Sequence, residues 1–486
     1  MLTRLRSALA TLLLLTSACA PRGAVAPAPT AAAGDGYDVI IENGRVVDGT
    51  GAAWYYGDVA LRGDRIAAIG PRGAFRGARA ASRVDATGQV VAPGFFDIQA
   101  HSIEHYMVGD GRAISMVTQG ITTAIHGEGS SLGPMNDNLL RSEADTASRR
   151  LLSQFTGPHG FGKWLEYMVA RGTSQNVGSF LGDGTLRVYA KGEEEGPLSP
   201  AELDSMRAAV RNAMADGAFG LASALIYPPN TYASTEELIE AAKAMAPYGG
   251  VYITHMRSEG DKFLEAMDEA IRIGREGGVP VEIYHLKASG PRNWYKMPLA
   301  IAKIDSARAA GQDVTADMYL YTAGGTALAA CAPPWAAADG KLLDNLRDPA
   351  TRARIKAEIL APVGDNEGLC TLGGPGMVQV VGFTKAELKQ YEGQRLDAIA
   401  RAMKMDWPDA LFEIVLAENA AIGAIFHMMT ESNLPLQIRQ PWIKWGTDAD
   451  GMNPDSTGGL LAHPRAYGNY PRLLGRYVRE QKVISL

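Results

Sequence analysis

Cysteine is scarce in this chain. Only three occur in 486 residues, and Cys19 lies in an N-terminal segment that resembles an export signal. The remaining two, Cys331 and Cys370, are too few to form a disulfide framework in a domain of this size. Stability must therefore come from a hydrophobic core, and the 46% apolar content of a chain this long is sufficient to build one.

Basic clusters with interleaved aromatic residues are also missing, and the formal net charge is −6. These two features exclude a nucleic-acid-binding protein. No internal repeat of solenoid period is present. The length leaves room for one large α/β domain with a smaller satellite, and the composition is that of an ordinary globular protein.

The one marked apolar run, ALATLLLLTSACA, follows Arg4 and Arg6 and is too short to cross a bilayer. It predicts a signal peptide over residues 1–20 and a protein exported to the bacterial periplasm or cell envelope. Ser17 and Ala18 before Cys19 resemble a lipoprotein processing site, which would anchor the chain to the membrane. Ala18-Cys19-Ala20 would equally serve ordinary signal peptidase, so both interpretations stay open. Residues 21–36 are expected to be a disordered tether.

Alternating apolar and polar residues over 38–48 and 57–70 predict a small antiparallel sheet, with turns at Asn-Gly and Gly-Asp. We expect residues 37–91 to form a small unit that precedes the main domain. From residue 92 onward, candidate strands alternate with helical segments. The first candidate strand ends near Gln99. The other seven lie near residues 121–129, 177–182, 219–225, 251–255, 281–285, 314–321 and 443–448. Eight such strands predict a (β/α)8 barrel over 92–486, with a helical insertion at about 333–420 over its mouth.

Two histidines end consecutive predicted strands, His255 in VYITH and His285 in VEIYH. The carboxyl ends of barrel strands meet at one rim, so these imidazoles indicate a metal site. The alternative is two unconnected core histidines. Other polar residues at predicted strand ends strengthen the metal hypothesis: Gln99, His101, His126, Glu128 and Asp448. Imidazole and carboxylate ligands favour zinc, and Asp448 is the natural general base beside it.

The sequence resembles the N-acyl-D-amino-acid deacylases, or D-aminoacylases, of the amidohydrolase superfamily. The resemblance runs from Tyr37 to Arg479 and rests on seven motifs in order: VAPGFFDIQAHS, QGITTAIHGEGSS, YITHMRSEG, VEIYHLKASG, DMYLYTAGGTALAACAPPW, WGTDADG and HPRAYGNYPRLLGRYVRE. It implies a zinc-bearing barrel, a β-sandwich built partly from the N-terminal strands, and a small-molecule substrate. The implied reaction is hydrolysis of the N-acyl bond of an N-acyl-D-amino acid.

The resemblance also implies roles for single residues. His255 and His285 match the family's paired zinc-binding histidines, and Asp448 matches the aspartate that activates water. Lys287 and Arg465 match the positions that hold the substrate's α-carboxylate. Tyr319 matches a residue that binds the substrate or its tetrahedral intermediate.

Four departures from the family pattern concern the metal and the substrate. Gln99 replaces the first of the paired histidines, which leaves His101 as the ligand there. The family's metal-binding cysteine after the second strand is replaced by GEG, so Glu128 becomes the third expected zinc ligand, ahead of His126. FGLASALIY lacks the superfamily's bridging lysine. The expectation is therefore one tightly bound zinc ion. Gly325 stands where the family has a substrate-binding serine.

Two further functions stay open. A cyclic amide or imide could be the substrate, as in dihydroorotase-like relatives, although Lys287 and Arg465 argue against a neutral ring. Alternatively, the chain could be an inactive envelope binding protein on an amidohydrolase frame. Because the sequence ends at RYVREQKVISL, we also expect part of the β-sandwich to be missing and the N-terminal sheet to keep an unpaired edge.

Overall fold

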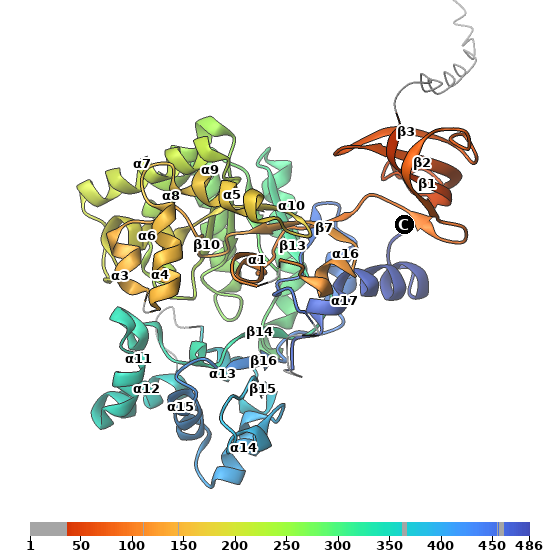
Figure 1. The fold of residues 1–486 in the computed structure, drawn as a ribbon. Helices are drawn as coiled ribbons and strands as arrows, with labels where there is room; N and C mark the ends of the chain where they lie inside the picture. The colour runs from red at the N-terminus through yellow and green to blue at the C-terminus, as the bar shows by residue number, and fades with distance from the viewer. Residues whose placement is uncertain (1–35, 110, 144, 362–366, 454, 456–460) are drawn as a thin grey trace, which may run out of the picture. The chain divides into compact units, whose positions relative to one another are not determined.

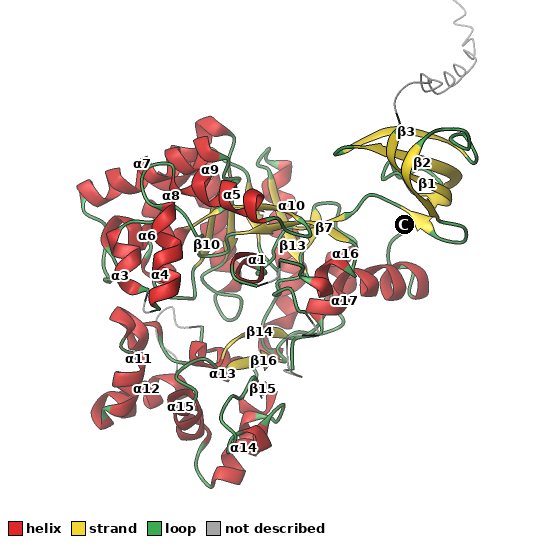
Figure 2. Cartoon of the chain, viewed as in Figure 1, coloured by secondary structure: helices red, strands yellow, loops and turns green. Residues whose placement is uncertain are grey.

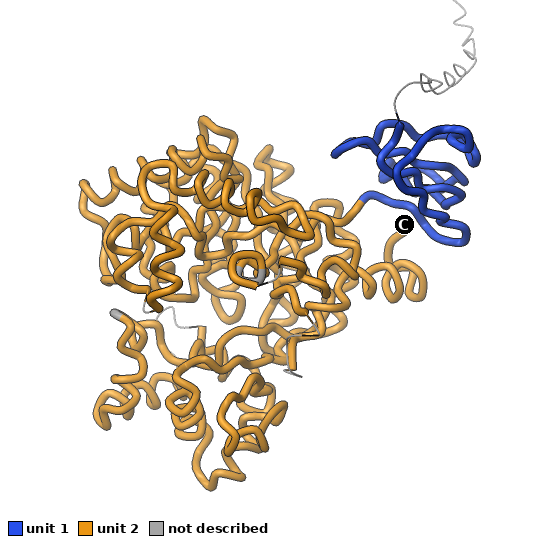
Figure 3. The backbone as a smooth tube through the Cα atoms, in the orientation of Figure 1, with its two compact units in different colours: residues 1–93 blue, residues 94–486 orange. Residues whose placement is uncertain are grey.

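The computed structural model describes residues 36–486 except 110, 144, 362–366, 454 and 456–460. The predicted signal peptide with Cys19, and the predicted tether up to residue 35, lie outside the described residues. The chain divides into two compact units at the boundary between Pro93 and Gly94 (Figure 3). Of the helices in the described ranges, none has the length and apolar character needed to cross a bilayer.

The first unit is one mixed sheet with strand order β3-β2-β1-β4, in which β5 also pairs with β1. The expectation of an antiparallel sheet is wrong in part, because β4 and β5 both run parallel to β1. Asn43-Gly44 is a bulge inside β1 rather than a turn, and Asn43 has a φ of 67°. The strands are β1 (Tyr37–Val46), β2 (Tyr55–Arg62), β3 (Arg65–Pro71), β4 (Ala80–Asp85) and β5 (Val90–Val91).

The second unit contains a parallel (β/α)8 barrel (Figures 1 and 2). Its third strand is broken at Phe180 into β8 and β9, which joins a three-stranded sheet to a six-stranded one. A bridge between Ala100 and Ala449 closes the ring beyond the first and last strands. The strands are β6 (Phe95–Asp97), β7 (Ile121–His126), β8 (Asn176–Ser179), β9 (Leu181–Gly182), β10 (Gly220–Ala224), β11 (Val251–His255), β12 (Val281–Ile283), β13 (Val314–Met318) and β17 (Ile443–Trp445).

Helices connect the barrel strands and pack their apolar faces on them. They are α1 (Ile103–Met107), α2 (Ile114–Val117), α3 (Asp137–Ser142), α4 (Thr146–Leu152), α5 (Gly160–Arg171), α6 (Asp183–Lys191), α7 (Pro200–Asp216), α8 (Thr235–Met245), α9 (Phe263–Gly277), α10 (Met297–Ala309), α16 (Leu434–Ile438) and α17 (Arg465–Arg472), which continues as η9 (Leu473–Glu480).

Helix α9 determines how the two histidine-bearing strands meet. It buries Phe263, Met267 and Ala270 on one face, at the spacing of an amphipathic helix. Gly274 lies so close to β12 that an added Cβ would come within 2.1 Å of the Val281 side chain. The helix stops at Gly278, whose φ of 73° is a conformation that glycine adopts without strain. This tight β-α-β unit places His255 and His285 at the same end of neighbouring strands.

The segment between β13 and β17 is not purely helical. It contains a three-stranded antiparallel sheet in the order β14-β16-β15, because short apolar runs such as VQVV pair across it. It also has its own apolar core, which includes Val380, Ile399 and Phe412. The elements are β14 (Gly324–Ala327), α11 (Leu342–Arg347), α12 (Pro349–Leu360), α13 (Leu369–Leu372), β15 (Val378–Val381), α14 (Leu396–Met403), α15 (Trp407–Ala417) and β16 (Gly423–Phe426).

The two cysteines of the second unit form a disulfide. Cys331 follows β14 and Cys370 lies in α13, with their Cα atoms 5.3 Å apart. Stability therefore does not come from the apolar core alone. The bond ties two parts of the inserted segment that are 39 residues apart in the sequence.

Candidate metal centre and active site

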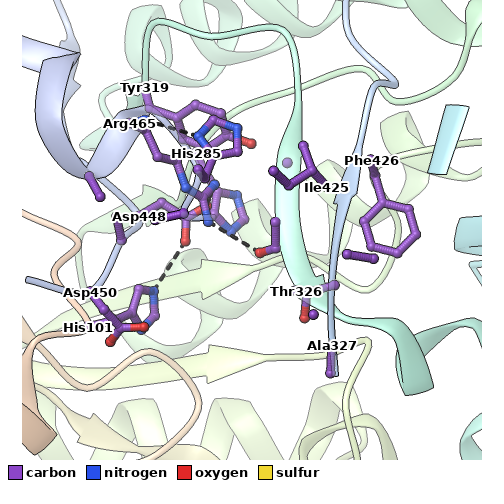
Figure 4. Close-up of a pocket in the computed structure, with 18 of the residues that line it drawn as sticks. His101, His285, Tyr319, Thr326, Ala327, Ile425, Phe426, Asp448, Asp450 and Arg465 are labelled. Carbon is purple, nitrogen blue, oxygen red and sulfur yellow. Dashed lines mark hydrogen bonds and ion pairs between the residues drawn. The ribbon is translucent and has the colours of Figure 1, made fainter. Parts of the chain in front are cut away.

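The predicted site residues surround one cavity of about 600 Å³. Its polar wall comes from the carboxyl ends of the barrel strands and the loops that follow them. Its apolar wall comes largely from the inserted sheet. Figure 4 shows His101, His285, Asp448 and Arg465 on one side of this cavity and Phe426 on the other.

Glu128 reaches the cavity because glycines flank it. Gly127 has a φ of 112°, and an added Cβ there would lie 2.4 Å from the backbone oxygen of Phe180. Gly129 has a φ of 66°. Residues with side chains rarely adopt these conformations, so the Gly-Glu-Gly sequence allows the chain to turn sharply after β7. The turn directs the Glu128 carboxylate toward the ends of β11 and β12.

Glu128, His255 and His285 form a compact group of metal-ligand atoms. The Glu128 Oε1 atom is 3.2 Å from His255 Nδ1 and 3.2 Å from His285 Nε2. One ligand atom from each residue lies within 4.8 Å of the other two. Two imidazoles and one carboxylate are the donor set of many zinc sites, so these residues fit a divalent ion of that kind.

A second group shares Glu128 and adds His101 and Asp448. The His101 Nε2 atom lies 3.2 Å from Glu128 Oε2 and 3.2 Å from Asp448 Oδ1. Gln99 lies beside this group, where its side-chain amide donates a hydrogen bond to the Glu128 Oε2 atom and its Oε1 atom is buried with no partner among the described residues. His126 is buried against Tyr106 instead, and burial lowers its pKa to about 3.

Two site residues have left-handed backbone conformations. The φ angle is 33° at His285 and 49° at Asp448. Such angles are strained for residues other than glycine and cluster at functional sites. Both are held by hydrogen bonds that their backbone N–H groups donate, to Asp317 Oδ1 and to the Gln99 carbonyl, each at 2.8 Å. The surrounding barrel therefore enforces the direction of both side chains.

The charges of the site are strongly coupled. Burial alone would lower the pKa of His285, but the surrounding carboxylates raise it to about 10. Burial would raise the pKa of Glu128, but His285, His101 and His255 hold it well below its usual range. Burial lowers the pKa of His255, the other imidazole that contacts Glu128. A divalent ion needs neutral imidazoles and an ionised carboxylate, so its binding here would compete with protons.

Lys287 lies in the cavity wall but is not a free cation. Its Nζ atom is 2.7 Å from Glu259 Oε1 and 2.7 Å from His285 Nδ1, and the residue is buried. Glu259 was not among the predicted site residues. It stands four residues after His255 in HMRSEG, and a carboxylate so close to a strand end is the signal that could have found it.

Arg465 lies at the start of α17, also buried. Its guanidinium pairs with Asp448 Oδ2 at 2.5 Å and donates to the Gly325 carbonyl at 3.2 Å. It packs over the Tyr319 ring with 4.6 Å between the guanidinium carbon and the ring centroid. Burial raises the pKa of Asp448, but Arg465 and the imidazoles bring it below its usual value. Asp448 is therefore an ionised carboxylate at neutral pH.

No protein-family model matches the sequence. The chain is 30% identical over 457 residues to the D-aminoacylase of Alcaligenes xylosoxydans xylosoxydans, covering 93% of this chain and 81% of that protein. This chain belongs to the D-aminoacylase family. It is 29% identical to the N-acyl-D-aspartate deacylase of the same organism, over 92% of this chain and 78% of the relative.

Solved structures of the D-aminoacylase family agree with the barrel. A D-aminoacylase described as defining a novel subset of amidohydrolases has a TM-score of 0.70 and 30% identity, covering 93% of this chain and 82% of its own. N-acyl-D-glutamate deacylase from Bordetella bronchiseptica has a TM-score of 0.72 and 26% identity, covering 93% and 83%. That structure holds zinc and a phosphonate that mimics the tetrahedral intermediate. The predicted barrel fold and family are confirmed, and the protein is an amidohydrolase, an enzyme that hydrolyses carbon–nitrogen bonds.

Proposed function

We propose that this protein is a zinc-dependent hydrolase that cleaves the N-acyl amide of N-acyl-D-amino acids. The observation that carries the proposal is the juxtaposition of Glu128, His255 and His285 with Asp448 and Arg465 around one cavity. Hydrolysis of an amide next to a free carboxylate requires three groups. They are a set of metal ligands, an ionised carboxylate and a buried guanidinium. The relatives named as D-aminoacylase and N-acyl-D-aspartate deacylase support the substrate class.

Glu128, His255 and His285 would hold the zinc ion, with His101 beside them. A bound zinc ion lowers the pKa of water and polarises a carbonyl oxygen. The proposal is one firmly bound ion, because Gln99, a poor zinc ligand, stands beside the group around His101.

Asp448 is the proposed general base. It takes a proton from the attacking water and passes it to the departing amide nitrogen. Its lowered pKa keeps it ionised, and Arg465 holds one of its oxygens while His101 faces the other. Arg465 is also the proposed partner of the substrate's α-carboxylate, which its planar guanidinium can bind through two hydrogen bonds. Tyr319, packed under Arg465, is placed to contact the same end of the substrate.

The charges around the cavity favour a substrate with a single carboxylate. Both cations in its described lining, Lys287 and Arg465, already have carboxylate partners. A second carboxylate on the substrate would find no unpaired lysine or arginine among these lining residues, which also include the carboxylate of Asp450. The opposite wall offers apolar side chains such as Ile425 and Phe426. We therefore include neutral, apolar side chains in the proposed substrate class.

The proposed location is the bacterial cell envelope, either periplasmic or anchored through Cys19. The signal-like run over residues 1–20 supports export. The Cys331–Cys370 disulfide supports it independently, because such bonds persist in oxidising compartments.

A substrate panel on zinc-loaded protein tests the activity. N-acetyl-D-leucine, its L enantiomer, N-acetyl-D-aspartate and a cyclic dihydropyrimidine should be compared by kcat/KM. We expect hydrolysis of the D-leucine derivative, with at least about tenfold lower values for D-aspartate and L-leucine derivatives. Turnover of the cyclic amide alone, or of none of the four, would reject the proposal.

A further inference from the structure

The two histidines of the candidate zinc site have carboxylates on both sides. Glu128 faces His255 Nδ1 and His285 Nε2, as described above. The opposite ring nitrogens face Glu259. Its Oε1 atom is 3.0 Å from His285 Nδ1, and its Oε2 atom is 3.7 Å from His255 Nε2. The imidazole pair thus lies between one carboxylate on the metal side and one on the far side.

Glu259 is held firmly in this position. It is 3% exposed, and Lys287 binds its Oε1 atom at 2.7 Å. Its backbone N–H donates to Glu367 Oε1 at 2.9 Å, and its carbonyl accepts from the Ser289 N–H at 2.7 Å. A carboxylate fixed through both its backbone and its side chain can in turn fix the groups that it contacts.

A histidine that offers Nε2 to a metal carries its proton on Nδ1, and that N–H needs an acceptor. Two groups lie near His285 Nδ1, the Glu259 carboxylate and the Lys287 ammonium. An ammonium has only donors, so Lys287 can donate to His285 Nδ1 only while that nitrogen is unprotonated. When a metal on Nε2 leaves the proton on Nδ1, Glu259 is the acceptor of these two neighbours. The Nε2 atom of His255 is buried with no hydrogen-bond partner among the described residues, and Glu259 is the carboxylate that faces it.

We infer that Glu259 is a positioning residue that orients His255 and His285 for zinc, while the same carboxylate holds Lys287. This inference rests on the proposed zinc site but not on the proposed substrate. It also explains why Lys287 is not free in the cavity wall: its ammonium belongs to the support of the metal centre.

The test is zinc affinity, measured by competition with a chromophoric chelator on the full chain. We expect Glu259→Gln to weaken zinc binding about 10- to 100-fold, the usual cost of losing an outer-shell partner. Glu259→Asp keeps the carboxylate and should recover part of the affinity. Glu282→Gln is the matched control. Glu282 is a buried glutamate on β12 that pairs with Lys444, and its loss should change the affinity less than about twofold.

The double variant Glu259→Gln/Lys287→Met separates positioning from simple charge balance. It removes the stranded ammonium as well, so it should fold even where the single variant does not. A positioning role predicts that zinc binding stays at least about tenfold weaker in the double variant, since a neutral amide oxygen accepts the imidazole N–H more weakly than the carboxylate does. Restoration to the wild-type affinity would overturn the inference, as would unchanged affinity in Glu259→Gln.

Failure of this inference about Glu259 can be distinguished from failure of the proposed function. If the wild-type protein binds zinc but hydrolyses no N-acyl-D-amino acid, the substrate proposal fails and the role of Glu259 can still be measured. If the wild-type protein binds no zinc, the metal centre itself is wrong and both proposals fall.

Discussion

Replacing Arg465 by alanine tests whether this guanidinium binds the substrate's α-carboxylate. In the structure it is buried, with donors to Asp448 Oδ2 at 2.5 Å and to the Gly325 carbonyl at 3.2 Å. A hydrogen bond to a charged group contributes about 1.5–3 kcal/mol. Alanine also leaves Asp448 without its cation, which would slow the reaction of every substrate. A loss of activity on one substrate therefore cannot distinguish a lost contact with the carboxylate from an effect through Asp448.

A pair of substrates resolves the ambiguity. N-acetyl-D-leucine carries the carboxylate, and N-acetyl-D-leucinamide has a neutral group in its place. The effect through Asp448 is common to both, so the change in the ratio of their kcat/KM values isolates the contact with the carboxylate. We expect the ratio of the value for the acid to the value for the amide to fall about 30- to 1000-fold. This fall corresponds to a loss of about 2–4 kcal/mol of transition-state stabilisation.

Arg472 provides the matched control for this experiment. It lies on the same helix, but it pairs with Glu431 rather than Asp448. Arg472→Ala should leave the ratio within about twofold of the wild type. Circular dichroism and zinc content would show that each variant is folded and loaded. Equal losses on the acid and the amide in Arg465→Ala would refute the assignment of Arg465 to the carboxylate.

Three further predictions concern the base, a buried acid and the disulfide. Asp448→Asn should lower kcat about 100- to 10,000-fold while zinc content stays the same, and a drop below tenfold would remove Asp448 as the base. Burial raises the pKa of Asp183 to about 7, so between pH 4 and 7 the folded state holds a proton that the unfolded state has released, and stability falls as pH rises. Asp183→Asn should remove this residue's share of the slope in urea melts, because Asp97 and Glu367 also have raised pKa values, and stabilise the protein above pH 7 on the order of a few kcal/mol. An unchanged pH profile would contradict the burial argument. The Cys331→Ser/Cys370→Ser variant should lose up to about 4 kcal/mol of unfolding free energy, from the closure of a loop of 39 residues, and identical melts with and without reductant would show that the bond contributes nothing.

The barrel could be predicted because its strands carry a local pattern. His255 and His285 each follow a short β-branched run, and the amphipathic segment between them is long enough for a crossover helix. Because parallel strands end at one rim, the meeting of these histidines follows from the topology alone. Glu128 and Asp448 joined the predicted cluster for the same reason.

The rest depends on contacts that no local pattern encodes. Glu259 lies beyond a strand end, and its partner Lys287 is 28 residues away, so their pairing is visible only in the fold. The Cys331–Cys370 bond is a tertiary contact of the same kind. Asn43-Gly44 was predicted as a turn because a turn and a bulge both need residues that tolerate positive φ.

The most direct measurement of the central claim is a zinc titration of metal-free protein, followed by hydrolysis of N-acetyl-D-leucine. If Glu128, His255 and His285 hold the catalytic ion, activity should be absent without metal and should rise linearly to a plateau at one equivalent of zinc. The Glu128→Gln variant should need a large excess. Activity that survives complete removal of the metal, or that is absent at every zinc concentration, would contradict the account.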